Sequence, residues 1–210
     1  MVPTALALLL AAAPAAPAAA APPTAEELAR RVQATYERTR DLEARFTQTY
    51  AYVGAGRRQV SRGTLKVKKP GMMRWDYEAP EPKVVAVTGR RLVQYEPEER
   101  QAYVDERFDA SAMSAAVTFL LGAGDLAREF HLSLADGGRL RLVPREPDPR
   151  VASVVLEVGP GGEVLGTTVT DGAGNENRLA FEAVRRNAGL ADAAFEVKLP
   201  PDVRRLGPGK

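Results

Sequence analysis

The segment VKKPGMMRWDYEAP, residues 67–80, combines groups that can bind an anion with groups that can bind an apolar ligand. Lys68 and Lys69 supply positive charge, whereas the methionines, tryptophan and tyrosine that follow are typical of the lining of a hydrophobic site. Pro70 and Gly71 divide the segment into two extended pieces, because proline ends a strand and glycine permits a turn. We interpret the whole segment as part of one apolar binding cavity.

The alternation of side chains along a strand assigns these residues to faces. In GTLKVKKPG, Leu65, Val67 and Lys69 share one face. After the turn, Met73 and Trp75 again lie on one face of a strand. Lys69 therefore ends an inward-pointing apolar row, and the other bases between residues 57 and 74 fall mostly on the solvent face or in the hairpin. An ordinary charged sheet edge explains those bases equally well.

Catalytic and metal-binding chemistry has little support in the sequence. The only histidine, His131, begins an expected strand with no nucleophile motif near it. The glutamates of residues 96–99 belong to a turn, and DGAGNEN, residues 171–177, has the oxygen ligands of a calcium loop without its spacing. We expect a binding protein that is not an enzyme and uses no cofactor or metal. An enzyme acting on acyl chains stays open as an alternative that would depend on His131.

The N-terminal residues predict export. Residues 1–21 carry no charged side chain, and their short apolar core is followed by alanines and prolines, the order found in a secretory signal peptide. We expect residues 22–210 to form one domain. The chain has no cysteine, which excludes disulfides, thiolate metal sites and a lipid anchor on cysteine. We therefore expect a soluble protein in the periplasm of a didermal bacterium, and a net charge of +2 gives no reason to expect nucleic-acid binding.

A helix is predicted at the start of this domain. Thr24 and Glu27 have the spacing of a capping box. Apolar residues then recur at helical steps through Leu28, Val32 and Tyr36, so one apolar stripe faces inward.

Most of the remaining chain is predicted to be strands. About eleven short segments with period-two patterning are separated by turn-forming residues. They lie near residues 44–53, 60–69, 73–79, 83–88, 91–96, 101–105, 130–135, 139–144, 152–158, 163–170 and 177–184. We expect a mainly β fold with one large antiparallel sheet, strongly curved or closed into a partial barrel. Residues 111–128, rich in alanine and leucine, fit two short helices that could cover one face.

Motifs along nearly the whole domain resemble those of the periplasmic lipoprotein carriers of the LolA type. The strand followed by Lys-Pro-Gly and Arg-Trp is the most specific of them. The motifs are FTQ at residues 46–48, GTLKVKKPGMMRWDYEAP at 63–80, TGRRLVQYEPEERQA at 88–102, FLLG at 119–122, LRLVPR at 140–145 and TDGAGNENRLAF at 170–181.

This resemblance implies a fold, a function and partners. The fold is an incomplete, unclosed antiparallel β-barrel covered by a helical lid and enclosing a hydrophobic cavity. Such carriers are monomers that accept acylated lipoproteins from an ABC-type exporter in the inner membrane and pass them to a lipoprotein receptor in the outer membrane. The lack of cysteine after the leader matches the soluble carrier and not the anchored receptor. A periplasmic lipid or lipoprotein sensor of the same fold is the alternative.

Two positions depart from the family's pattern. Many carriers have an arginine before the motif proline that helps to hold the lid closed, and here that position is Lys69. Lysine keeps the charge but lacks the planar fork of arginine, so a looser latch is expected. Met73 stands where those carriers have phenylalanine, whereas Trp75 matches the family's tryptophan. We expect the short tail after Pro201 to lack the extension that some members use.

The predicted site is a cavity for acyl chains. Burying one methylene is worth ~0.8 kcal/mol, so a sixteen-carbon chain left in water costs on the order of 10 kcal/mol. A cavity partly filled by its own lid binds such chains but still releases them without ATP. Plain core packing is the alternative for each residue. The predicted lining is Val32, Tyr36, Leu42, Phe46, Leu65, Val67, Met73, Trp75, Phe119 and Leu120, with Lys69 as the lid latch.

Overall fold

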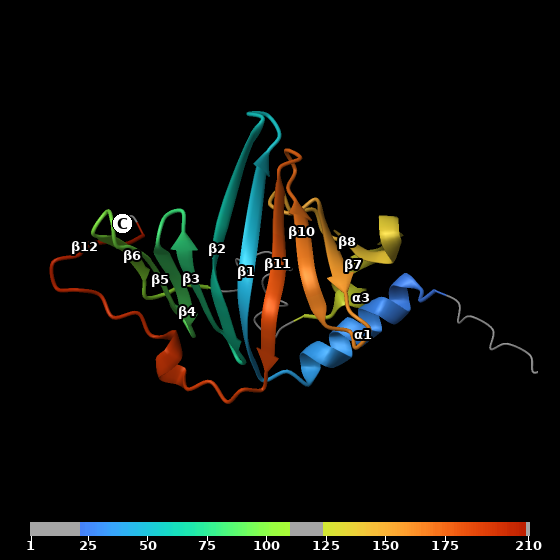
Figure 1. The fold of residues 1–210 in the computed structure, drawn as a ribbon, viewed down its shortest axis with the longest axis horizontal. Helices are drawn as coiled ribbons and strands as arrows, with labels where there is room; N and C mark the ends of the chain where they lie inside the picture. Colours follow the sequence, from blue (N-terminus) through green and yellow to red (C-terminus); the bar gives the residue numbers. More distant parts are fainter. Residues whose placement is uncertain (1–21, 110–123, 209–210) are drawn as a thin grey trace, which may run out of the picture.

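One twelve-stranded sheet organises the computed structural model, which describes residues 22–109 and 124–208 (Figure 1). The strand order is β12-β6-β5-β4-β3-β2-β1-β11-β10-β9-β8-β7. Neighbouring strands are antiparallel except β12, which runs parallel to β6. Because β7 and β12 stand at opposite ends of this order, the sheet is not closed into a barrel. This confirms the predicted large, unclosed antiparallel sheet.

The observed elements agree closely with the predicted ones. All eleven predicted strands are present, and β12 is an additional strand. The strands are β1 Asp41–Tyr52, β2 Arg57–Lys68, β3 Met72–Ala79, β4 Lys83–Thr88, β5 Arg91–Glu96, β6 Gln101–Asp105, β7 Phe130–Ala135, β8 Arg139–Pro144, β9 Ser153–Val158, β10 Val164–Thr170, β11 Glu176–Arg186 and β12 Arg204–Leu206. The helices are α1 Ala25–Glu37 and α3 Leu126–Glu129, with short 3-10 turns η2 Asp136–Gly138 and η3 Asp192–Phe195.

Helix α1 begins at the predicted capping box. The backbone N–H of Glu27 donates to Oγ1 of Thr24 at 3.2 Å, and the backbone N–H of Thr24 donates to Oε2 of Glu27 at 3.0 Å. The apolar stripe of the helix, including Leu28 and Val32, is buried. It packs on β7 and β8 at one end of the sheet (Figure 1).

Most of the segment predicted to form two short helices lies outside the described residues. Its described end forms α3, for which Asp125 is the N-cap. One carboxylate oxygen of Asp125 accepts from the backbone N–H groups of Ala127 and Arg128. These bonds satisfy donors that a helix start leaves without partners.

Two apolar clusters form the core on the face of the sheet that α1 covers, which we call the inner face. The first joins α1 and α3 to β7–β9 and includes Leu28, Val32 and Phe130. The second lies on β1–β3 and is built around Phe46 and Leu65. The helix and the middle of the sheet thus enclose apolar surface between them.

The C-terminal segment after β11 crosses the outer face of the sheet and reaches β12 beside β6 (Figure 1). Nζ of Lys68 donates to the carbonyl of Leu190 at 2.7 Å and to Asp192 at 2.5 Å. Nη1 of Arg74 donates to the carbonyl of Glu196 at 2.7 Å. Phe195 is fully buried. Lys68 and Arg74 therefore lie on the face predicted for them, but they bind this segment and are not merely solvated.

Candidate functional site

The predicted cavity residues of the central strands lie side by side on the inner face. Leu42 of β1 is opposite Val67 of β2, and Val67 is opposite Met73 of β3. One step further along, Leu65 is opposite Trp75. Because residues directly opposite in neighbouring strands share a face, these side chains form one continuous apolar surface.

Phe46 occupies the centre of an aromatic group. Its ring makes edge-to-face contacts with Trp75, at a centroid distance of 4.8 Å, and with Tyr77, at 5.1 Å. Gly63 stands opposite Phe46, where a β-carbon would lie 2.0 Å from the carbonyl oxygen of Asp76 and 3.0 Å from the Phe46 ring. The absence of a side chain at Gly63 thus lets β3 and the ring approach β2 closely.

A cavity of about 70 Å³ lies between α1 and this apolar surface. Five predicted residues line it, while Phe46, Met73 and Trp75 belong to the apolar cluster beside it. The predicted residues that line it are Val32, Tyr36, Leu42, Leu65 and Val67. Phe119 and Leu120 lie outside the described residues.

Strand β11 adds a wall that was not predicted. Phe181, Val184 and the side chain of Arg186 line the cavity because β11 pairs with β1. The alternation in NRLAF within the predicted strand near residues 177–184 marks Phe181 as facing one side. It does not show that this strand lies next to β1, which is far away in sequence.

Lys69 connects the turn after β2 to the end of α1. Its Nζ donates to the carbonyl oxygen of Tyr36 at 2.5 Å and lies 3.9 Å from the centroid of the Tyr36 ring. Its backbone N–H donates to the carbonyl of Arg40 at 2.9 Å. Burial lowers the pKa of Lys69, and the nearby carboxylate of Glu37 partly opposes this effect. A cation at the last turn of a helix also interacts favourably with the helix dipole.

The residues that follow β11 hold the link between α1 and β1 in place. Asp41 is buried, and its two carboxylate oxygens accept from the backbone N–H groups of Ala188, at 2.7 Å, and Gly189, at 3.2 Å. The backbone N–H of Arg40 donates to Oδ1 of Asn187 at 2.7 Å. The chain is therefore fixed immediately after the helix.

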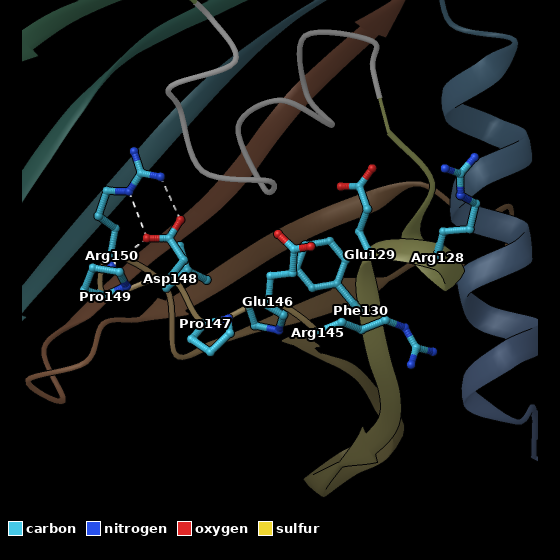
Figure 2. Close-up of a pocket in the computed structure, with 11 residues that line it drawn as sticks. Arg128, Glu129, Phe130, Arg145, Glu146, Pro147, Asp148, Pro149 and Arg150 are labelled. Atoms are coloured by element: carbon cyan, nitrogen blue, oxygen red, sulfur yellow. Dashed lines mark hydrogen bonds and ion pairs between the residues drawn. The ribbon is translucent and has the colours of Figure 1, made fainter.

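A second hollow, of about 750 Å³, lies beside α3 and the start of β7 (Figure 2). Its walls come from α3, the start of β7 and residues 144–151. Asp148 and Arg150 form a two-pronged ion pair with both oxygens of Asp148 engaged at 2.9 Å. The Arg150 side chain lowers the pKa of Asp148. None of the predicted site residues within the described ranges lines this hollow, and its walls are more charged than those of the cavity under α1.

Comparison with known proteins assigns the chain to a family. The family described as outer membrane lipoprotein carrier protein LolA matches residues 37–198. The chain belongs to the LolA family. An outer-membrane lipoprotein carrier protein of Alkalilimnicola ehrlichii is 30% identical over 192 residues, which cover 89% of this chain and 88% of that protein. Another, from Dechloromonas aromatica, is 28% identical over 175 residues, or 80% of this chain and 82% of that protein.

A solved structure supports the fold independently. An uncharacterized conserved protein from Thermus thermophilus superposes with a TM-score of 0.53 at 14% identity, and the match covers 87% of this chain and 98% of that one. LolA family carriers are non-enzymatic binding proteins, which confirms the prediction that the chain is not an enzyme.

His131, on which an enzyme would depend, lies with Nδ1 3.3 Å from Nη1 of Arg145 on an exposed strand position. Within residues 22–109 and 124–208, no cluster of three His, Cys, Asp or Glu side chains is arranged to hold a metal ion. Within the same ranges, no helix is both long enough and apolar enough to cross a membrane.

Proposed function

We propose that this protein carries acylated lipoproteins through the periplasm and binds their acyl chains between α1 and the inner face of β1–β3. It would accept them from an ABC-type exporter in the inner membrane and deliver them, as a monomer, to a lipoprotein receptor in the outer membrane. Three observations support this proposal: the family assignment, the names of its relatives, and the apolar cavity beneath α1. The cavity is the observation on which the binding mode depends.

The cavity must widen to receive an acyl chain. Sites for ligands of moderate size enclose about 300 Å³ or more, whereas this one has about 70 Å³. The described conformation is therefore a closed one, in which apolar side chains of the protein fill most of the space. Opening it exposes apolar surface to water, and this cost lowers the net affinity for the ligand. A moderate affinity permits release without an energy source.

Movement of α1 is the simplest way to open the cavity. The first turns of α1 are packed in the core cluster through Ala25, Leu28 and Ala29. Its last turn borders the cavity through Tyr36 and is attached to the sheet by Lys69. Breaking the contacts of Lys69 would free the end of the helix that covers the cavity. Lys69 would thus act as the lid latch.

A transfer experiment tests the proposal. Purified protein without residues 1–21 is added, with ATP, to inner-membrane vesicles that contain the exporter and a tagged lipoprotein. A soluble one-to-one complex of carrier and lipoprotein is the expected product. Val67→Asp should prevent it, because a carboxylate would then face the acyl chain, and Val67→Phe should reduce it by filling the cavity.

The matched control is Val60→Asp. Val60 is on the same strand but on the outer face, where it is 41% exposed. This variant should form the complex as the unmodified protein does. Thermal melting of each variant separates loss of binding from loss of folding. Failure of the unmodified protein to release lipoprotein from vesicles that are active with another carrier would refute the carrier function and favour a lipid sensor.

A further inference from the structure

Another pocket, separate from the two described above, lies on the inner face and has a polar lining. It has a volume of about 340 Å³ and lies at the edge of the sheet formed by β5, β6 and β12. We call it the polar pocket, and its lining residues are Gln94, Glu96, Gln101, Tyr103 and Leu206. The function proposed above assigns it no role.

The polar pocket lies on the same face of the sheet as Trp75 and next to the apolar surface to which Trp75 belongs. Trp75 is opposite Val85 of β4, and Val85 is opposite Gln94 of β5. Gln94 is opposite Tyr103 of β6. These four side chains share the inner face, because each pair is directly opposite. Neighbouring strands are ~4.8 Å apart, so the pocket begins about 10 Å from Trp75.

A fixed carboxylate stands in this pocket. Nε2 of Gln94 donates to Oε1 of Glu96 at 2.9 Å, and Nε2 of Gln101 donates to Oε2 at 2.8 Å. These hydrogen bonds, that of Gln101 most strongly, lower the pKa of Glu96. Glu96 therefore remains anionic at neutral pH and orients both glutamine side chains through their N–H groups.

The polar pocket also offers a free acceptor and a free donor. In the described part of the chain, the carbonyl oxygen of the Gln94 side chain and the hydroxyl of Tyr103 make no hydrogen bond to the protein. The two residues are opposite one another, with β-carbons about 5 Å apart. An acceptor beside a donor is the pattern that binds the N–H and C=O groups of a peptide backbone.

Attachment of β12 explains only part of this arrangement. Nη2 of Arg204 donates to Oε1 of Gln101 at 2.7 Å, so Gln101 helps to hold β12 against β6. Gln94 and Tyr103 are not needed for that contact. The side-chain carbonyl of Gln94 and the hydroxyl of Tyr103, both half-buried, are therefore available to a ligand.

We propose that the polar pocket binds the peptide backbone that follows the acylated residue of a lipoprotein. Gln94 accepts a hydrogen bond from a peptide N–H, and Tyr103 donates one to a peptide C=O. This inference rests on the proposed function, since the acyl chains would occupy the neighbouring apolar cavity. Contacts to backbone groups do not depend on the peptide's sequence, which suits a carrier of many different lipoproteins.

Two ligands distinguish a peptide site from a lipid site. One is a short synthetic peptide that begins with triacylated cysteine, and the other is triacylated cysteine amide without further residues. Binding to the purified protein is followed by the fluorescence of Trp75, the chain's single tryptophan. Tyr103→Phe and Gln94→Met should each weaken binding of the peptide about fivefold and leave binding of the amide unchanged.

Tyr95→Phe provides the matched control. Tyr95 is opposite Val84, and Val84 is opposite Asp76, so all three lie on the outer face. The same chemical change there should alter binding of neither ligand. Unchanged binding of the amide by Tyr103→Phe also shows that this variant is folded.

Each other outcome contradicts the inference in a different way. Equal weakening for both ligands would mean that the pocket binds the amide or ester groups of the lipid. No weakening for either ligand would mean that the polar pocket takes no part in binding. If the unmodified protein binds neither ligand, the proposed function fails and the inference fails with it.

Discussion

Lys69 and Tyr36 make two contacts with each other, and together these contacts join the end of α1 to the turn after β2. The ammonium group of Lys69 donates to the Tyr36 carbonyl oxygen and lies over the Tyr36 ring. The carbonyl belongs to the last turn of α1 and also accepts a hydrogen bond from the backbone N–H of Thr39 at 3.0 Å. One side chain thus supplies a hydrogen bond and a cation–π contact at the end of the helix that borders the cavity.

We expect Lys69→Met to favour the open form. Losing these contacts should destabilise the closed form by about 1–2 kcal/mol, which corresponds to a factor of about 5–30 in the closed-to-open ratio. Binding of a fluorescent fatty acid should become tighter by up to this factor, because less of the binding energy is used for opening. Amide hydrogen exchange in the last turn of α1 should become faster.

Two variants control this prediction. Lys69→Arg keeps a cation and should retain much of the closed form. Lys66→Met removes a nearby lysine of β2 that lies on the outer face, where its Nζ is 3.9 Å from Glu43. It should leave fatty-acid binding and exchange in α1 unchanged. Equal behaviour of Lys69→Met and Lys66→Met in both measurements would show that Lys69 is not a latch.

Gly63→Ala should destabilise the protein. A β-carbon at Gly63 would lie 2.0 Å from the carbonyl oxygen of Asp76, so β2 and β3 would have to separate locally. We expect a loss of about 1–3 kcal/mol in the free energy of unfolding, measured by urea denaturation. Gly54→Ala, in the β1–β2 turn with no atom within 4 Å of its added carbon, should lose less than about 0.5 kcal/mol. Similar losses in the two variants would contradict the packing described for Gly63.

Tyr77 should make the protein less stable at alkaline pH. Burial raises the pKa of Tyr77 above its usual range, and a hydrogen bond from Gln48 only partly opposes this shift. The unfolded chain therefore loses the phenol proton at a lower pH than the folded chain does. Stability from this source is fully present below about pH 10 and is lost as pH rises through the folded pKa.

The variant Tyr77→Phe isolates this effect. Its free energy of unfolding should fall less steeply than that of the unmodified protein between about pH 9 and 11. Urea denaturation at several pH values measures the slope, and Tyr95→Phe controls for the general loss of a phenol. Parallel slopes for the Tyr77 variant and the unmodified protein would show that the Tyr77 phenol is not buried as described.

Phe195→Ala should detach the C-terminal segment from the outer face. Phe195 is fully buried in η3, which packs on β3 and β4. Removing the ring should cost about 3–5 kcal/mol in the free energy of unfolding. Leu206→Ala, in the same segment but 42% exposed, should have a much smaller effect. Comparable losses for the two variants would mean that Phe195 does not anchor the segment.

The local patterns in the sequence predicted most of the elements. The capping box at Thr24 and Glu27 marked the start of α1, and period-two alternation marked eleven of the twelve strands. The alternation also showed that Leu65 and Val67 share a face. Such patterns depend on neighbours within a few residues, so the sequence displays them directly.

β12 escaped prediction because nothing in its sequence is typical of a strand. Arg204–Leu206 is three residues long and polar at two of its positions. It becomes a strand only because its backbone pairs with β6 in parallel, about one hundred residues away in sequence. Without it, the polar pocket would lack the wall that Leu206 provides.

The alternation of residue types was enough to assign which side chains share a face, and it placed Lys69 at the end of an apolar row. What each face contacts became known from the folded chain. It placed Tyr36 against Lys69, β11 beside β1, and the C-terminal segment on the outer face. The physical reason is that alternation fixes the direction of a side chain relative to its own strand, whereas its partner depends on contacts between segments distant in sequence.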